Sequence, residues 1–179
     1  AVDGDYVDND GTLSFAGTKG DVTANLKTGE FSGADGNGSV SNVQNLVGGD
    51  GNDFLTGTTD TKSMIGGKGD DTFDPGGANN VTIKGGDGNN NTLTFAGATD
   101  DVVANLKTGE FSGGDGCGTV VDIQNLIGGN GNDFLTGTTD TKSMTGGTGN
   151  DTFDPGGASN VIIDGGGGTN NTLSFEGTS

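Results

Sequence analysis

The sequence predicts an all-β fold, a β-solenoid built from tandem 80-residue units, on the basis of three observations. Residues 13–92 align with residues 93–172 without a gap, and 59 of the 80 positions are identical. Glycine supplies 40 of the 179 residues, which excludes a helical domain because each glycine costs a helix about 1 kcal/mol relative to alanine. Short β-prone segments alternate with Gly, Asp and Asn turns, a pattern typical of stacked coils that each bury one or two apolar residues.

The repeat also predicts how the chain is organised. Residues 1–12 read as the degenerate end of a preceding unit, 13–92 and 93–172 as two full units, and 173–179 as the start of a third. The only prolines, Pro75 and Pro155, each follow a predicted strand, where a missing N–H does little harm. Strands are expected in the first unit, and at the equivalent positions of the second, at residues 22–26, 40–47, 54–56, 72–73 and 81–83.

Differences between the units indicate which positions face the core. Val43 and Val47 become Ile in the second unit, as buried positions require, whereas Lys19 becomes Thr, as solvated positions allow. Phe54 precedes Leu55 in an alternating strand, so Phe54 is expected to face outward, as is Phe134 in the second unit. Outward aromatic side chains favour either cover by neighbouring coils or lateral contact between chains.

Composition excludes several classes of function. The formal charge is −18 with only seven basic residues, so the Lys and Arg clusters that bind nucleic acid are missing. There is no His, which excludes His-based catalysis and His-ligated zinc, and the single Cys117 cannot form an internal disulfide. No apolar run approaches the roughly 20 residues of a membrane span. No pattern of paired carboxylates suggests a catalytic cleft, and we predict that the chain is not an enzyme.

Four segments are nearly the same nonapeptide, G-G-x-G-x-D-x-U-x, where U is apolar. They are residues 48–56, 66–74, 128–136 and 146–154. Glycine at the first, second and fourth positions permits positive φ and lets the backbone pass close to an ion. Inward carbonyls and the carboxylate at the sixth position are hard oxygen ligands, of which Ca²⁺ takes 6–8. One turn is too small to supply them all, so a second turn has to complete the shell.

This nonapeptide resembles the calcium-binding repeat of the RTX, or hemolysin-type, proteins, and the resemblance covers residues 48–74 and 128–154. It implies a right-handed parallel β-roll in which two nonapeptides make one coil, so that the chain returns to the same side after each pair. Asp53 and Asp71 are separated by two nonapeptides, as are Asp133 and Asp151. The resemblance further implies secretion and folding in extracellular calcium, as in long repetitive surface proteins of that family.

We therefore predict calcium sites between successive motif turns, with binding coupled to folding because stacked carboxylates repel one another without an ion. The turn from Gly85 has Asn90 at the sixth position and the turn from Gly165 has Asn170, so these turns are expected to bind weakly or not at all. The intervening turns lack the motif, which predicts ions along one side of the roll only. The predicted metal-binding residues are Gly49, Gly51, Asp53, Gly66, Asp71, Gly129, Gly131, Asp133, Gly146 and Asp151.

The function expected from these features is structural: a calcium-rigidified extracellular β-solenoid in a surface fibre, matrix filament or adhesin stalk. Its expected partner is another copy of itself, bound head to tail through sheet edges. Two alternatives stay open. One is a calcium-dependent secretion and folding module of a secreted enzyme. The other is recognition of ice or of a surface polysaccharide or glycan, for which the Thr-rich stretches at 56–59 and 136–139 are candidates.

Overall fold

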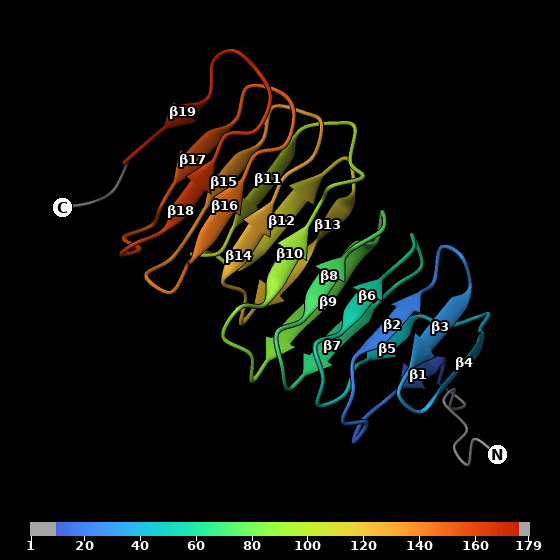
Figure 1. The fold of residues 1–179 in the computed structure, drawn as a ribbon. Coiled ribbons are helices and arrows are strands. Elements are labelled where there is room, and N and C mark those ends of the chain that lie inside the picture. Colours follow the sequence, from blue (N-terminus) through green and yellow to red (C-terminus); the bar gives the residue numbers. More distant parts are fainter. Residues whose placement is uncertain (1–9, 176–179) are drawn as a thin grey trace.

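The computed structural model describes residues 10–175 and is all-β, with two mostly parallel sheets (Figure 1). Within these residues there is no helix that could cross a membrane. Most of the predicted end of a preceding unit, residues 1–9, and most of the predicted third unit, residues 176–179, lie outside the described residues.

In spatial order, the ten-stranded sheet contains β1 (Thr12–Ser14), β5 (Asn45–Val47), β7 (Ser63–Gly67), β9 (Asn79–Gly86), β13 (Gly116–Val121), β12 (Glu110–Gly113), β11 (Val102–Asn105), β15 (Phe134–Thr136), β17 (Thr152–Asp154) and β19 (Thr172–Leu173). The nine-stranded sheet contains β18 (Ile162–Asp164), β16 (Ser143–Thr145), β14 (Asn125–Ile127), β10 (Thr92–Thr94), β8 (Thr72–Asp74), β6 (Phe54–Thr56), β2 (Val22–Asn25), β3 (Glu30–Gly33) and β4 (Gly36–Ser39).

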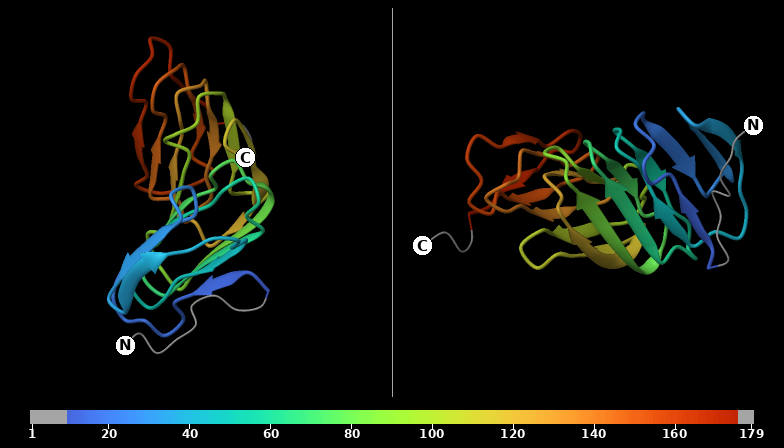
Figure 2. Two further views of the ribbon diagram at one scale, coloured as in Figure 1. Left: turned by 90° about the vertical axis from the view of Figure 1, so that its right-hand side faces the viewer. Right: turned by 90° about the horizontal axis from the view of Figure 1, so that it is seen from below.

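Outside two hairpins, the chain crosses from one sheet to the other after each strand, and the two sheets face each other (Figure 2). Each strand then pairs in parallel with the strand that lies two crossings earlier. Phe54 pairs with Thr72, so two nonapeptides do return the chain to the same sheet, one strand along, as the family resemblance implied. This register holds the motif turns of one unit beside each other.

The core is thin, because no strand contributes more than two buried apolar side chains. In the ten-stranded sheet, the inward side chains run in cross-strand register from Leu13 through Leu46, Met64 and Ile83 to Val120. Leu55 and Leu135 are fully buried, whereas Phe54 and Phe134 are 41% and 40% exposed, which confirms the predicted outward direction of both phenylalanines. Each unit thus contains a thin but continuous core.

The expectation of parallel coils throughout is wrong at one place in each unit. Strands β2, β3 and β4, and their counterparts β11, β12 and β13, form antiparallel hairpins. The first hairpin turns because Asn25 Oδ1 accepts from the backbone N–H groups of Lys27 and Thr28, at 2.9 and 3.1 Å, and Gly29 takes a φ of 71°. The strand predicted over 40–47 is also shorter, since β5 begins at Asn45 after a left-handed Asn42.

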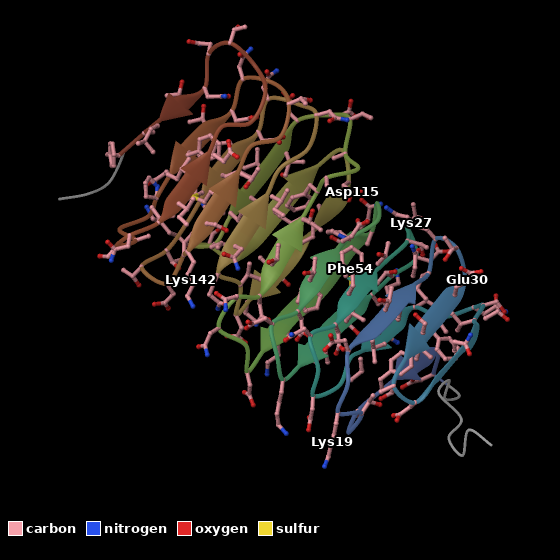
Figure 3. The ribbon with its side chains drawn as sticks, viewed as in Figure 1. Lys19, Lys27, Glu30, Phe54, Asp115 and Lys142 are labelled. Carbon is pink, nitrogen blue, oxygen red and sulfur yellow. The ribbon has the colours of Figure 1, made fainter. Side chains whose placement is uncertain are left out.

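The motif turns are not confined to one side of the molecule, and the prediction of a single loaded side is wrong. Strand β1 lies in the ten-stranded sheet, but its counterpart in the second unit, β10, lies in the nine-stranded sheet, so one unit makes an odd number of crossings. The motif turns of the first unit lead from the ten-stranded sheet to the nine-stranded one, and those of the second lead back. Connections of these two kinds lie on opposite long edges. Figure 3 shows Lys19 and Lys142, from connections of the first kind, along one edge and Lys27 and Asp115 along the other.

Motif glycines stack directly on one another from turn to turn. A Cβ added at Gly67, where φ is 118°, would overlap the carbonyl oxygen of Gly49, and one at Gly69 would overlap that of Gly51. The second unit repeats the arrangement at Gly147 and Gly149. These glycines are therefore needed for close backbone approach, independently of any ion.

We expect Gly67→Ala to lower the free energy of unfolding by at least about 2 kcal/mol, because alanine combines a positive φ with a backbone overlap. Gly97→Ala is the matched control, since a Cβ there meets nothing within 4 Å, and it should change stability by less than about 0.5 kcal/mol. Urea unfolding followed by circular dichroism measures both. Equal losses at the two positions would contradict the stacking of the turns.

Candidate metal centre

The sixth-position aspartates of the motif form a buried ladder. Asp53 Oδ1 accepts from the backbone N–H of Val22, and Asp71 Oδ1 accepts from that of Asp53, each at 2.8 Å. In the second unit Asp133 and Asp151 make the same bonds with the same lengths. None of the four side chains is more than 2% exposed. The two carboxylates of each unit are therefore brought together, as predicted, by consecutive turns.

Asparagine continues each ladder past the last aspartate. Asn91 Oδ1 accepts from the N–H of Asp71, and Asn171 Oδ1 accepts from that of Asp151, both at 2.8 Å. The prediction that Asn90 and Asn170 take this place is wrong, because these turns are longer than the motif and move the inward position on by one residue. Since an amide fills the same place, the ladder itself requires only one acceptor oxygen.

The second carboxylate oxygen of each aspartate lies against the first glycine of its own turn. A Cβ added at Gly48 would overlap both Asp53 Oδ2 and the carbonyl oxygen of Gly66. At Gly66, the added Cβ would meet Asp71 Oδ2 and the carbonyl oxygen of Gly85. Gly128 and Gly146 repeat this in the second unit with Asp133 and Asp151. All four motif turns thus bring a carboxylate oxygen and a carbonyl oxygen of the next turn to one place.

Two of these carboxylate oxygens lack a donor. Asp53 Oδ2 accepts from the N–H of Gly49 at 2.6 Å, and Asp133 Oδ2 does the same with Gly129. Asp71 Oδ2 and Asp151 Oδ2, in contrast, are buried and have no hydrogen-bond partner within the described residues. The glycines that follow in those turns, Gly67 and Gly147, have φ of 118° and 108°, whereas Gly49 has no positive φ, and their N–H groups make no hydrogen bond to these oxygens. A buried oxygen left in this way costs about 1–3 kcal/mol, and more when it is charged.

The asparagine positions show what is missing at the aspartates. Asn171 Nδ2 donates to the carbonyl oxygens of Gly165 and Gly167, at 3.2 and 2.9 Å, and Asn91 Nδ2 donates to that of Asp122 at 3.0 Å. Asp71 and Asp151 have an oxygen where asparagine has this N–H, and an ionised carboxylate and a carbonyl repel each other. A proton or a cation between the two oxygens removes the repulsion.

The titration of these groups reflects the same environment. Burial, together with the nearby carboxylates of Asp53, Asp70 and Asp21, raises the pKa of Asp71 to about 7. Burial also raises the pKa values of Asp53 and Asp133, although backbone N–H groups oppose the effect at both. At neutral pH the ladder therefore contains carboxylates whose ionisation is unfavourable without nearby positive charge.

The remaining predicted ligands divide into two groups. The carbonyl oxygens of Gly66 and Gly146 lie beside Asp53 Oδ2 and Asp133 Oδ2, as a shared site requires. The carbonyl oxygen of Gly49 instead accepts from the N–H of Lys68 at 2.9 Å. Gly129 makes the same bond to Thr148, and the carbonyls of Gly51 and Gly131 lie against Gly69 and Gly149 in the glycine stack. The carbonyl oxygens of these four glycines therefore contact the backbone of the next stacked turn, whereas those of Gly66 and Gly146 lie beside an aspartate oxygen.

Sequence reasoning missed two carbonyl oxygens that the structure places in the site. They belong to Gly85 and Gly165, which lie beside Asp71 Oδ2 and Asp151 Oδ2. The Gly-Gly pair that begins both turns is the signal that could have found them, but neither turn has the sixth-position aspartate on which the ligand prediction depends.

The donor set is composed of oxygen alone. Among residues 10–175, no group of three or more His, Cys, Asp or Glu side chains is placed to hold a metal ion. In each unit two motif turns each place one carboxylate oxygen beside one carbonyl oxygen, and further backbone carbonyls have to supply the other ligands. Hard oxygen donors of this kind suit Ca²⁺ rather than zinc or copper, so the residues fit calcium where the unpartnered oxygens lie.

An exposed ladder of fifth-position residues runs beside the buried one and needs no ion. Asp21 Oδ1 accepts from the N–H of Asn52 at 2.8 Å, and Asn52 Oδ1 accepts from that of Asp70 at 2.7 Å. A hydrogen bond from the Asn90 side chain lowers the pKa of Asp70, so the ionised form of this carboxylate is stabilised. This second ladder is not predictable from sequence, because its members are Asp at some positions and Asn at others, and the two units differ.

A third buried carboxylate oxygen without a hydrogen-bond partner, among the described residues, lies where the two units meet. Asp115, at the tip of the β12–β13 hairpin, has its Oδ2 atom buried without a hydrogen-bond partner within the described chain, and its carbonyl accepts from Gly77 N–H at 3.0 Å. Burial and then the neighbouring Asp74 raise the pKa of Asp115 to about 6. Lys27 Nζ lies 3.2 Å from Asp74 Oδ2 and offsets one of the two charges. The site matches no predicted metal ligand, and a proton suffices to relieve it.

We expect Asp115→Asn to stabilise the protein at pH 7.5 and to change it little at pH 4. The folded pKa of about 6 lies above the ordinary value of 3.8, so the stability linked to protonation of Asp115 is complete below about pH 4 and lost as the pH rises through 6. Urea unfolding at both pH values measures the difference, with the exposed Asp87→Asn as the control for net charge. Equal effects of the two substitutions would contradict the strain at Asp115.

A comparison with protein-family models gives no match for this chain, and a comparison with curated proteins finds no significant relative.

Proposed function

We propose that this chain is a calcium-binding structural protein, secreted and built into an extracellular fibre, surface layer or adhesin stalk. In this proposal the 80-residue units wind as a right-handed β-solenoid of the β-roll type, and calcium makes the solenoid rigid. The observation that carries the proposal is the meeting, at every motif turn, of a buried carboxylate oxygen and a carbonyl oxygen of the next turn.

The proposed ligands follow from that meeting. In the first unit they are the carboxylates of Asp53 and Asp71 and the carbonyl oxygens of Gly66 and Gly85. In the second unit they are Asp133 and Asp151 with Gly146 and Gly165. Asp71 and Asp151 carry the strongest support, because their second oxygens have no donor within the described residues. Calcium supplies there the positive charge that the chain itself does not.

A structural role follows from what calcium does to stability. No strand contributes more than two buried apolar side chains to the core, and the net charge is −18, so the unloaded protein is expected to be only marginally stable. A ligand that binds only the folded state adds RT ln(1 + [Ca²⁺]/Kd) for each site. Extracellular calcium modules bind with a Kd of roughly 0.1–1 mM, which fits a protein that becomes rigid only after secretion.

Urea unfolding at pH 7, followed by circular dichroism, tests the proposal. At a calcium concentration about 100 times Kd, the free energy of unfolding should exceed that in EGTA by about 2.7 kcal/mol for each site. Magnesium at the same concentration is the control for ionic screening, and its effect should be small because Mg²⁺ dehydrates reluctantly and demands octahedral geometry. Superimposable curves in calcium and EGTA would overturn the calcium-binding function.

A further inference from the structure

The two units meet through a strand-to-strand joint inside the chain. Strand β9 of the first unit pairs in parallel with β13, the outer strand of the second unit's hairpin. The register sets Thr82 beside Thr119 and Ile83 beside Val120. Ile83 and Val120 are 0% and 2% exposed there, as is typical of a packed core. This joint shows how one 80-residue unit recognises the next.

Both surfaces of the joint recur at the two ends of the nine-stranded sheet. Strand β18 is the second unit's counterpart of β9, and β4 is the first unit's counterpart of β13. In the described part of the chain β18 pairs with β16 and β4 pairs with β3, which leaves one edge of each strand open. Figure 1 shows β18 and β4 at opposite ends of the molecule. Each end therefore carries the surface that the other end would recognise.

Side-chain exposure measures what is left open. Val161 and Ile163 are partly exposed, whereas their counterparts Val81 and Ile83 are 1% and 0% exposed. At the other end, Phe31 and Val40 are partly exposed, whereas Phe111 and Val120 are 3% and 2% exposed. Neither β4 nor β18 contains the Lys or Pro residues that natural sheets use to prevent edge pairing. The side chains at both ends are thus equivalent to side chains that are buried in the internal joint, but in the described part of the chain they are more exposed.

We propose that β18 of one chain pairs in parallel with β4 of a second copy, in the register that joins β9 to β13. Val161, Ile162 and Ile163 then lie beside Gly38, Ser39 and Val40 of the second copy. The contact is head to tail and uses different surfaces on the two partners, so it does not close and it continues as a fibre. The inference rests on the proposed structural function but does not depend on calcium.

The other sheet constrains the joint further. Within the chain, β10 pairs with both β8 and β14, so the joint has room for one strand there. Two segments with the sequence Leu-Ser-Phe could take this place, residues 13–15 of one copy and 173–175 of the other. Leu13 and Phe15 are 0% and 4% exposed, whereas Leu173 and Phe175 are 50% and 62% exposed. Strand β1 is thus the better packed of the two, and in the joint it pairs with β17 of the first copy and displaces β19.

Disulfide cross-linking tests this register. Cys117 pairs with Asn79 across the internal joint, and its Sγ lies 3.7 Å from Asn79 Oδ1. The corresponding positions between chains are Asn37 of one copy and Ser159 of the other, and both are exposed in a single chain. The variant is Asn37→Cys with Ser159→Cys in a Cys117→Ser background. Mild oxidation of the folded protein should give a ladder of covalent oligomers, because the two cysteines of one chain lie too far apart to meet.

The control pairs Asn37→Cys with Asp140→Cys, an exposed position in a turn that the joint does not use. A ladder from the first variant and not from the control supports the joint, and equal cross-linking of the two overturns it. Cross-linking without a calcium effect on unfolding retains the joint and rejects the calcium function, and the reverse result rejects the joint alone. Leu173→Asp in the cross-linking background should leave the ladder unchanged or stronger, and its loss would show that residues 173–175, not β1, fill the shared place.

Discussion

Replacing both Asp71 and Asp151 by Asn is expected to abolish most of the stabilisation that calcium gives. Asparagine keeps the Oδ1 acceptor of the ladder, as Asn91 and Asn171 already do in the neighbouring turns. It also supplies an N–H toward the carbonyl oxygens of Gly85 and Gly165. The substitution therefore preserves the fold while it removes one carboxylate ligand and one buried charge from each pair of motif turns.

Two results are expected from urea unfolding at pH 7. In EGTA the double variant should be more stable than the parent chain by about 1–3 kcal/mol for each position, because a buried unpaired oxygen disappears. In calcium the order should reverse, since only the parent chain gains binding free energy. Asp87→Asn with Asp140→Asn changes the net charge equally at exposed positions and should leave the calcium effect intact. An undiminished calcium effect in the Asp71 and Asp151 variant would contradict the assigned ligands.

Without calcium, the protein is expected to become more stable as the pH falls from 8 to 5. The pKa of Asp71 is about 7 in the folded chain and 3.8 is its ordinary value, so the folded state binds the proton more tightly than the unfolded state. The stability linked to this proton is complete below about pH 4 and is lost as the pH rises through 7. Raised pKa values at Asp53 and Asp133 act in the same direction. We expect a gain of about 2 kcal/mol, after allowance for solvent screening.

Calcium should replace the proton in this dependence. With calcium bound at pH 8, stability should be high, and the calcium effect should shrink on acidification because the ion and the proton compete for the same carboxylates. Urea unfolding in EGTA and in calcium at four or five pH values measures both trends. The Asp71→Asn variant should flatten the EGTA curve. Loss of stability on acidification throughout this range, with calcium absent, would contradict the account.

Regularity made part of this structure predictable from sequence. The 18-residue spacing of the motif aspartates, taken with the two nonapeptides per coil that the family resemblance implies, predicted which turns lie side by side, and the hydrogen bond between Asp53 and Asp71 has this spacing. The alternation at Phe54 and Leu55 predicted which side chain enters the core. These features are local or periodic, and the sequence displays such features directly.

The sequence predictions failed where one extra residue in a turn, or one extra strand in a unit, changes how the following chain is placed. The hairpins of β2–β4 and β11–β13 consist of short segments between Gly and Asn turns, as the parallel strands do, and the turn at Asn25 that reverses the chain is a short hydrogen-bonding pattern. Once a hairpin is added, the number of crossings in one repeat unit is not given by the motif period. For the same reason the sequence predicted Asn90 at the inward position of its turn, whereas Asn91 lies there in the structure. The sheet that a strand enters, and the strand with which it pairs, depend on every strand before it. One strand or residue placed wrongly therefore changes both.

The glycines could not decide between an ion site and a purely structural turn. Gly67 and Gly69 are required for stacking whether or not calcium binds, so their presence in the motif carries less information about metal than their number suggests. The unpartnered oxygens of Asp71 and Asp151 separate the two interpretations, because a ladder of amides would not create them. That distinction needed three-dimensional structure.

The most direct test of the central claim is the amount of calcium bound at pH 7, measured by equilibrium dialysis of the parent chain and of the double variant at Asp71 and Asp151. We predict that the parent chain retains at least one ion for each pair of motif turns at millimolar calcium, and that the double variant loses these ions while it stays folded. A parent chain that retains no calcium, or a variant that retains as much as the parent, would contradict that claim.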